Sequence, residues 1–238
     1  RRLTSRGVDG VLLIPARESC AAGAGAALRE DVERVTCPVV LIDRLTQCGW
    51  CDAVGFDNYL GGRLAAQYLL EGGHKRIGIV TGDVAESSAA DRRRGFVDAI
   101  EQAGERFDPA LCVSGDYRFD GGYHAADRII DGGATAVFCC NDVMALGFRQ
   151  RMAERGLHVT EDMQVIGYDN ILRRFGLGLR MTTVEQSVVD LAAAGWGMLG
   201  SRIDAVVRGD GDSGAGRPWL ASPQVKVLTP KLVQAACA

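Results

Sequence analysis

The chain has 238 residues, a hydrophobic fraction of 47% and a formal net charge of −3 at pH 7. This length suits one large α/β domain or two smaller lobes, with ample apolar content for a core. No stretch approaches the ~18 uninterrupted apolar residues of a membrane span, and no signal-peptide core follows the charged first residues. The basic residues are scattered, so the chain has no surface typical of proteins that neutralise DNA phosphates. We therefore expect a soluble cytoplasmic globule.

Short apolar runs alternate with amphipathic stretches of helical length, a pattern typical of βαβ units and a parallel sheet in an α/β fold. In chain order, the expected strands are 7–15, 39–43, 53–56, 77–81, a short strand near 112, 136–140, 163–168, 181–184, 224–228 and 232–233. The expected helices are 24–35, 58–71, 91–103, 120–130, 143–155 and 186–207. A Gly- and Asp-rich stretch over 209–216 indicates a flexible linker.

Five of the apolar runs end in a polar residue placed where a small ligand could be bound. These residues are Asp43, Asp57, Asp83, Asn141 and Asp169. In parallel sheets the ligand lies outside the carboxyl ends of the strands. The recurrence therefore predicts a binding cleft.

Eight cysteines raise the question of disulfides, zinc or redox chemistry. Cys139 and Cys140 lie in an apolar run and point to opposite faces of a strand, so they are poorly placed to bond each other. The Cys-Gly-Trp-Cys sequence at 48–51 looks like a redox dithiol, but a helix normally follows such a motif, whereas 52–56 indicates a loop and short strand. No second ligand pair stands at zinc spacing. We predict no metal and no cofactor.

Seven segments resemble, in order and spacing, the signature of the LacI/GalR family of bacterial transcriptional regulators. They are Val8-Asp9-Gly10; Pro38 to Arg44; Asp57-Asn58-Tyr59-Leu60-Gly61-Gly62 followed by Gly73-His74-Lys75-Arg76-Ile77; Asp91 to Phe96; Asn141 to Gly147; Val165 to Asn170; and Thr182 to Gln186. The resemblance implies a periplasmic-binding-protein type I fold: two Rossmann-like lobes joined by three crossovers, with an effector in the cleft. The first lobe would hold 1–56 and 185–212, and the second 57–184 and 218–238.

Two features of the family are not found in the sequence. Family members begin with a helix-turn-helix headpiece and a hinge helix, by which a dimer reads its operator. The family's first core strand and helix, which would precede Leu3, are missing as well. We expect the missing strand to leave an uncovered sheet edge and apolar surface. We interpret the chain as part of a longer repressor, with a natural protein that starts at Arg1 as the alternative.

Four residues of the second lobe match effector contacts of the family: Arg92, Tyr117, Asn141 and Asp169. A guanidinium can donate a fork of hydrogen bonds to ring and hydroxyl oxygens or pair with a carboxylate. The resemblance assigns Tyr117 to stacking on the ligand, with ordinary loop packing as the alternative. Asp142, beside Asn141, is expected to cap the helix that begins at Val143 rather than to bind ligand.

Two residues of the first lobe complete the candidate ligand-binding set. Asp43 ends a buried strand, where its carboxylate can accept bonds from two hydroxyls of one sugar; a turn or helix-cap role is the alternative. Phe56 is a weaker candidate for an apolar wall, because a phenylalanine at a strand end is more often core. Asp43 and Asp169 favour a neutral polyol over a phosphate, while Arg92 and Arg44 leave a carboxylate-bearing effector open.

The leading hypothesis is the effector-binding and dimerisation core of a transcriptional regulator. Ligand would close the lobes about hinges near 56–57, 184 and 213–217. A homodimer would use apolar faces of the helices near 60–70 and 187–207, and operator DNA would bind only through the missing headpiece. The alternative is a stand-alone sugar-binding protein of a transport system, which needs a secretory signal and suits eight free thiols badly. We do not expect an enzyme, because no nucleophile elbow, P-loop or strand-linked Gly-x-Gly-x-x-Gly is present.

Overall fold

The structure is a computed structural model, and it divides the chain into two units. It describes residues 7–15, 25–45, 49–83, 87–172, 181–209 and 222–235. The first unit comprises Arg1–Phe56, Ala85–Ser87 and Ser187–Leu228, and the second comprises Asp57–Val84, Ser88–Gln186 and Thr229–Ala238. The chain therefore passes from one unit to the other after Phe56, after Gln186 and after Leu228, among other places.

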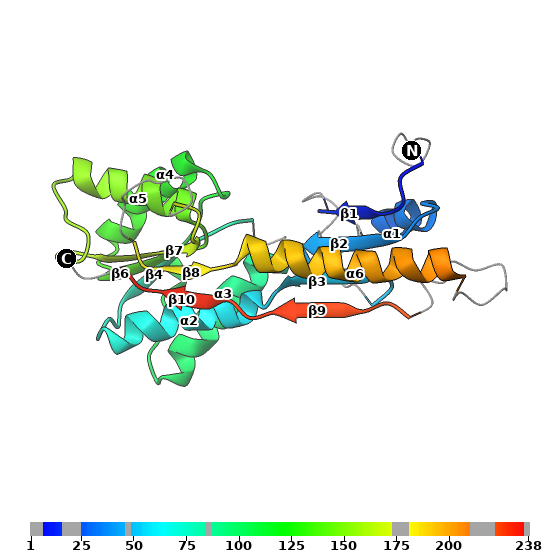
Figure 1. The fold of residues 1–238 in the computed structure, drawn as a ribbon. Coiled ribbons are helices and arrows are strands. Elements are labelled where there is room, and N and C mark those ends of the chain that lie inside the picture. The colour runs from blue at the N-terminus through cyan, green and yellow to red at the C-terminus, as the bar shows by residue number, and fades with distance from the viewer. Residues whose placement is uncertain are drawn as a thin grey trace. The chain divides into compact units, whose positions relative to one another are not determined.

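The first unit contains a four-stranded parallel sheet in the order β1-β2-β3-β9. Its elements are β1 (Val11–Leu13), β2 (Val39–Asp43), β3 (Asp52–Phe56), β9 (Val225–Leu228), α1 (Gly25–Glu33) and α6 (Val188–Arg208). Val39 and Leu41 of β2 pack in a cluster with residues of α1, whereas Val40 packs with residues of α6. Because successive strand side chains point to opposite faces, the two helices cover opposite faces of the sheet (Figure 1).

The position of β9 corrects the expected division of the chain. We expected all of 218–238 in the second lobe, but β9 pairs in parallel with β3, with Val225 opposite Ala53. Strand β3 has β2 on one side, and β9 supplies the hydrogen-bonding partner on the other. Only the following strand, β10 (Lys231–Val233), belongs to the second unit.

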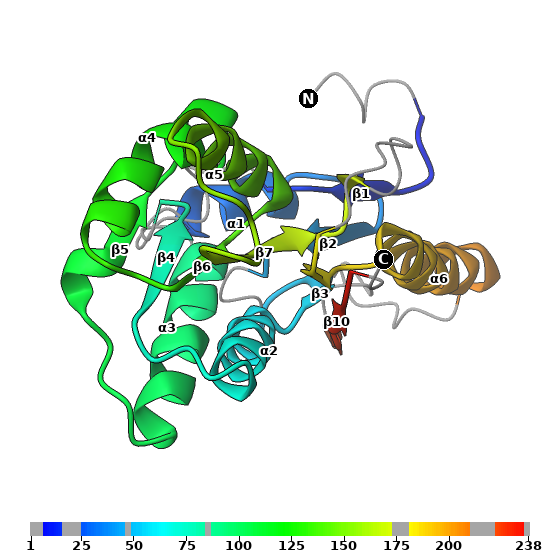
Figure 2. The same cartoon turned by 90° about the vertical axis from the view of Figure 1, so that its left-hand side faces the viewer.

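The second unit contains a six-stranded sheet in the order β10-β8-β7-β6-β4-β5. Its other strands are β4 (Ile77–Thr81), β5 (Cys112–Ser114), β6 (Ala136–Cys139), β7 (Gln164–Asp169) and β8 (Thr183–Glu185). Its helices are α2 (Asn58–Glu71), α3 (Ser87–Gln102), α4 (Phe119–Asp131), α5 (Asp142–Glu154) and the short 3-10 helix η3 (Pro109–Leu111). All pairings are parallel except that of β10 with β8. Helices α4 and α5 cover one face, and α2 and α3 the other (Figure 2).

Large aromatic side chains fill the core of the second unit. Phe96 of α3, Phe138 of β6, Phe148 of α5 and Tyr168 of β7 are fully buried. The rings of Phe96 and Phe138 lie 5.4 Å apart between centroids, a favourable distance for an aromatic pair. The expected α/β class, with parallel-dominated sheets flanked by helices, is confirmed.

Local sequence signals account for the ends of α2, which occupies the expected range 58–71. The side chain of Asp57 accepts a hydrogen bond of 2.8 Å from the backbone N–H of Leu60, and this caps the helix. After the helix, Gly73 takes a φ of +83°, which favours glycine. Asp57, one of the strand-end polar residues, is therefore a helix cap.

The linker expected at 209–216 and the hinge expected at 213–217 lie outside the described residues, apart from Gly209. That glycine ends α6 with a φ of +72°. Among the described ranges, no helix combines the length and the apolar character needed to cross a bilayer.

Candidate functional site

The second unit brings its four predicted site residues together at the carboxyl ends of β6 and β7. Asp169 is the last residue of β7, and Asn141 follows β6. Arg92 of α3 donates through Nη1 to the carbonyl of Cys140 at 2.6 Å, and Asn141 donates through Nδ2 to the carbonyl of Tyr117 at 3.1 Å. Because ligands of parallel sheets bind at this edge, we take these residues as the candidate effector site.

Arg92 is the buried centre of the site, with 7% of its surface exposed. Its guanidinium lies 3.7 Å from the ring centroid of Tyr168. Besides the bond to Cys140, Nε donates to Asn58 Oδ1 at 2.8 Å and Nη2 donates to Gln186 Oε1 at 3.4 Å. These three bonds use one N–H group on each of the three nitrogen atoms of the guanidinium. The carboxylate of Asp169 stands 4.0 Å from Nη2.

The charge of Arg92 is stabilised by its surroundings. Burial lowers its pKa, but Tyr168, Tyr117 and Asp169 together raise it by more. The same burial raises the pKa of Tyr168 to about 12 and that of the Cys140 thiol to about 12. The site therefore presents a permanent cation beside one carboxylate and neutral hydroxyl and thiol groups at neutral pH.

Glycines at the contact between α2 and α3 bring Arg92 close to Asn58. A Cβ on Gly62 would lie 2.0 Å from the backbone oxygen of Arg92, and a Cβ on Gly95 would lie 2.0 Å from that of Tyr59. Real Cβ atoms do not approach backbone oxygen so closely, so only glycine permits this contact. The glycines of two quoted motifs therefore have one structural purpose, which is to let the two helix backbones touch beside the site.

Asn141, not Asp142, caps helix α5, which corrects the expected assignment. The Oδ1 atom of Asn141 accepts a 2.8 Å bond from the N–H of Met144, and its backbone is extended, as a capping residue requires. Asp142 is already helical and buried, and it accepts bonds from Thr183 Oγ1 at 2.8 Å and Ile171 N at 2.7 Å. Burial raises the pKa of Asp142. Its carboxylate joins β8 to the segment after β7.

Tyr117 occupies an unusual backbone conformation, with a φ of +58°. Its half-buried ring packs on Gly82, where an added Cβ would lie 2.0 Å from the tyrosine Cε2 atom. Its carbonyl is held by Asn141. This contact is the ordinary loop packing that was the alternative to stacking on a ligand. It also fixes the Tyr117 ring at the candidate site.

In the first unit, Asp43 and Phe56 lie at the carboxyl ends of neighbouring strands. Asp43 is half-buried and has a φ of +73°, and Asp169 in the second unit has a φ of +94°. Residues other than glycine rarely adopt such values, and strained positions gather at ligand sites. Phe56 is 4% exposed and packs with Leu191 of α6, in agreement with the core role given as its alternative.

Three residues of the site were missed in the sequence: Asn58, Tyr168 and Gln186. All lie inside the quoted motifs, yet a polar residue in the first turn of a helix or after a strand ordinarily indicates an exposed position. Asn58 and Gln186 are each 8% exposed, and Tyr168 is fully buried. For Asn58, the signal that could have been used is its spacing from the glycines that follow it, since these glycines bury the start of α2.

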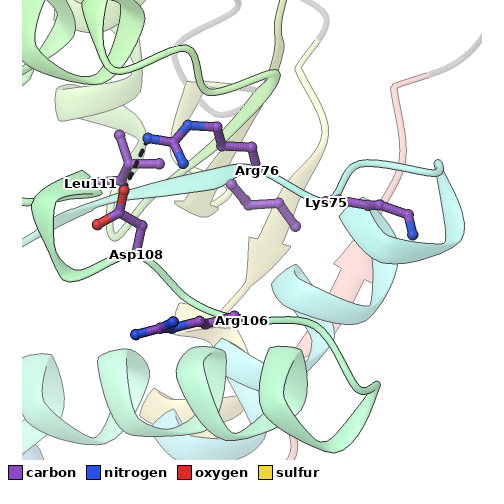
Figure 3. Close-up of a pocket in the computed structure, with 6 residues that line it drawn as sticks. Lys75, Arg76, Arg106, Asp108 and Leu111 are labelled. Carbon is purple, nitrogen blue, oxygen red and sulfur yellow. Dashed lines mark hydrogen bonds and ion pairs between the residues drawn. The ribbon is translucent and has the colours of Figure 1, made fainter.

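Two adjoining hollows lie elsewhere on the second unit. One has a volume of about 140 Å³ and is lined by Lys75, Arg76, Ile77, Arg106, Asp108 and Leu111 (Figure 3). The other has a volume of about 340 Å³ and shares Arg76, Arg106 and Asp108. Arg76 already pairs with Asp108 at 2.9 Å, and Lys75 pairs with Glu105 at 2.9 Å. These hollows lie by the first residues of β4, at the end of the sheet where ligands of parallel folds do not bind, so we do not assign the effector to them.

No group of three His, Cys, Asp or Glu side chains that could hold a metal is found in the part of the chain that the structure describes. Of the Cys-Gly-Trp-Cys motif, Cys48 lies outside the described residues. Cys51 is buried and its Sγ contacts the carbonyl of Val39 at 3.4 Å. His74 follows α2, with Nδ1 3.0 Å from Thr135 Oγ1, and burial lowers its pKa.

Comparison with known proteins identifies the family. Residues 66–226, more than half of the chain, match the periplasmic binding protein-like domain. Together with the repressors and LacI-family regulators described next, this match shows that the chain belongs to the LacI/GalR family. The family resemblance inferred from the seven segments is thus confirmed.

Curated relatives of this LacI/GalR-family chain are repressors. The HTH-type transcriptional repressor PurR of Pasteurella multocida (strain Pm70) is 35% identical over 204 residues, which cover 85% of this chain and 60% of that protein. PurR of Haemophilus influenzae (strain PittEE) is 36% identical over 170 residues, which cover 71% of this chain and 50% of that protein. The chain therefore spans half or somewhat more of the length of these relatives.

Solved structures of the family agree with the fold. A LacI family transcriptional regulator from Enterococcus faecium with bound ribose has a TM-score of 0.80 and 26% identity, covering 98% of this chain and 81% of that one. A complex of the transcriptional regulator CelR with cellobiose has a TM-score of 0.81 and 27% identity, covering 98% and 67% of the two chains.

Proposed function

We propose that this chain is the effector-binding core of a transcriptional regulator and that Arg92 is the principal contact of its small-molecule effector. The observation that carries the proposal is the position of the buried guanidinium of Arg92, which is oriented by three hydrogen bonds and lies 4.0 Å from the carboxylate of Asp169 at the ligand-binding edge of the sheet. Burying a cation costs free energy that pairing and hydrogen bonds must offset. Asn141 and Tyr117 are proposed to complete the second unit's part of the site.

The chemistry of the site favours a sugar or sugar derivative. Arg92 donates hydrogen bonds and Asp169 accepts them, and a polyol offers both acceptors and donors within a few ångströms. The side chain of Asp169 is 31% exposed and would repel a phosphate. Asp43 is proposed as a second carboxylate from the first unit. The ribose and cellobiose in the similar structures support this ligand class.

Transcriptional control is proposed for the whole protein of which this chain would be the core. The relatives are transcriptional repressors, which supports a repressor rather than a transport protein. On this proposal the partners are operator DNA, bound through a helix-turn-helix headpiece, and a second copy of the chain. Effector binding would change the orientation of the lobes and so the affinity for DNA. Because the proposed target is DNA, we expect the protein to act in the cytoplasm.

Thermal unfolding with a panel of pentoses, hexoses, disaccharides and sugar acids tests this proposal. A ligand at a hundred times its dissociation constant adds ~2.7 kcal/mol to the free energy of unfolding, which raises Tm by several degrees. We expect at least one sugar to do so, and Asp169→Asn and Arg92→Met to abolish its shift. Asparagine tolerates the positive φ of position 169. If the Arg92→Met variant folds, it tests the role of the arginine directly. If that variant does not fold, the ligand shift of Asp169→Asn decides whether the site is correctly assigned.

Arg94→Met is the matched control, because Arg94 lies on the same helix and is exposed, and its contacts within the described residues are with Asp91 at 2.8 Å and the Tyr59 ring at 5.1 Å, not with the predicted site residues. It is expected to keep the full ligand shift. A sugar that stabilises Asp169→Asn and Arg92→Met as much as the unchanged chain would contradict the assignment of the site.

A further inference from the structure

Two hydrogen-bond partners of Arg92 stand where the chain passes between its units. Asn58 is the second residue after the passage at 56–57, and Gln186 is the last residue before the passage at 186–187. They are 128 residues apart in sequence. Both are buried, and both accept from the guanidinium of Arg92. We call Arg92, Asn58 and Gln186 the Arg92 triad.

The triad is closed, because its two amides also bond each other. Asn58 Oδ1 accepts from Arg92 Nε at 2.8 Å and from Gln186 Nε2 at 3.2 Å. Gln186 Oε1 accepts from Arg92 Nη2 at 3.4 Å, and Gln186 Nε2 also lies 3.1 Å from the hydroxyl of Tyr168. The hydroxyl of Tyr168 donates in turn to Asn58 Oδ1 at 3.4 Å. The guanidinium is therefore held along one side by two segments and stacked on Tyr168, so its remaining N–H groups have a fixed direction.

We propose that Asn58 and Gln186 are positioning residues, which orient Arg92 for the effector and join the effector site to two of the passages between the units. This inference rests on the proposed function, because it names how the same site would be coupled to the rest of the chain. In a buried setting a hydrogen-bonded set loses much of its stabilisation when one member moves. A ligand that shifts the guanidinium therefore changes the surroundings of Asn58 and Gln186 together.

Packing alone does not require these residue types. An apolar side chain of similar size would fill either position without needing hydrogen-bond partners, whereas the amides here bond one another, Tyr168 and Arg92. The direct prediction is reciprocity: loss of Asn58 loosens the chain at 184–187, and loss of Gln186 loosens it at 57–62. Coupling between two sites is necessarily mutual.

Hydrogen–deuterium exchange of the full chain without ligand tests this prediction. Asn58→Leu is close in shape but removes the accepting oxygen, and we expect amides at 184–187 to exchange about tenfold faster, as for the loss of a buried hydrogen bond. Asn58→Asp keeps an accepting oxygen for Arg92 and should restore slow exchange. Gln186→Met should speed exchange at 57–62 and gives a second measurement if Asn58→Leu does not fold. Gln150→Met is the control, because Gln150 is exposed and, within the described ranges, its side chain bonds Glu154 alone.

Unchanged exchange at 184–187 in Asn58→Leu and at 57–62 in Gln186→Met would overturn the proposal, because the two segments would then not depend on each other through the triad. A second arm uses D-ribose as the probe. If ribose binds the unchanged chain, Asn58→Leu should weaken it about tenfold and Asn58→Asp should recover most of that loss; equal affinities would overturn the positioning role. If ribose does not bind at all, this counts against the sugar assignment, while the ligand-free exchange still decides on the triad.

Discussion

Gly62→Ala or Gly95→Ala is expected to destabilise the protein by about 1–3 kcal/mol or to prevent its folding. Each added Cβ would lie 2.0 Å from a backbone oxygen of the facing helix. A backbone oxygen cannot turn aside as the end of a flexible side chain can, so α2 and α3 must separate. That separation also draws Asn58 away from Arg92. Urea unfolding followed by circular dichroism measures the loss as a lower midpoint.

The matched control for this prediction is Gly197→Ala in helix α6, where a Cβ would meet no atom within 4 Å. Alanine is the better helix former, so this variant should gain about 0.5–1 kcal/mol. If Gly62→Ala proved as stable as Gly197→Ala, the close contact of α2 with α3 would be wrong.

Asp52→Ala is expected to cost about 3–5 kcal/mol, because it leaves a partly buried cation without its partner. Asp52 is 1% exposed and binds Arg202 of α6 through two bonds, of 2.7 Å to Nε and 2.9 Å to Nη2. Its Oδ1 atom also accepts from the backbone N–H of Gln224 at 2.7 Å. The pair thus fixes α6 and the start of β9 to β3. The free energy of unfolding at neutral pH measures the effect.

An exposed ion pair in the same unit provides the control. Glu33 on α1 pairs with Arg29 at 2.7 Å, and both side chains are about half exposed. Pairs of this kind contribute about 0–1 kcal/mol, so Glu33→Ala should change little. Equal losses for Asp52→Ala and Glu33→Ala would show that the Asp52 pair does not hold the sheet to the helix.

The helices and strands of this fold can be predicted from local sequence signals, but the neighbour with which a strand pairs cannot always be predicted in this way. Helix α2 could be placed correctly because its apolar period, its Asp57 cap and its terminal glycines are all within one segment. Residues 225–228 were correctly expected as a strand but assigned to the wrong lobe. Hydropathy shows that a segment prefers a sheet, whereas its neighbour depends on which edge remains open far away in sequence.

The same distinction applies to the site. The rule that ligands gather at strand ends, joined to the family resemblance, selected Arg92 and Asp169, which the structure places 4.0 Å apart at the closest atoms. The cap of α5 was wrongly assigned to Asp142 instead of Asn141, because both residue types cap helices and only the backbone conformation distinguishes them. Asn58 was missed because its burial depends on a helix contact between segments more than thirty residues apart.

A crystal structure of the chain with the sugar that most raises its Tm tests the central claim most directly. The proposal predicts that hydroxyl or ring oxygens of the ligand lie within hydrogen-bond distance of the Arg92 guanidinium, and that a ligand hydroxyl donates to the carboxylate of Asp169. A ligand bound away from both side chains, for example in the hollow lined by Lys75, Arg76 and Arg106 (Figure 3), would contradict it.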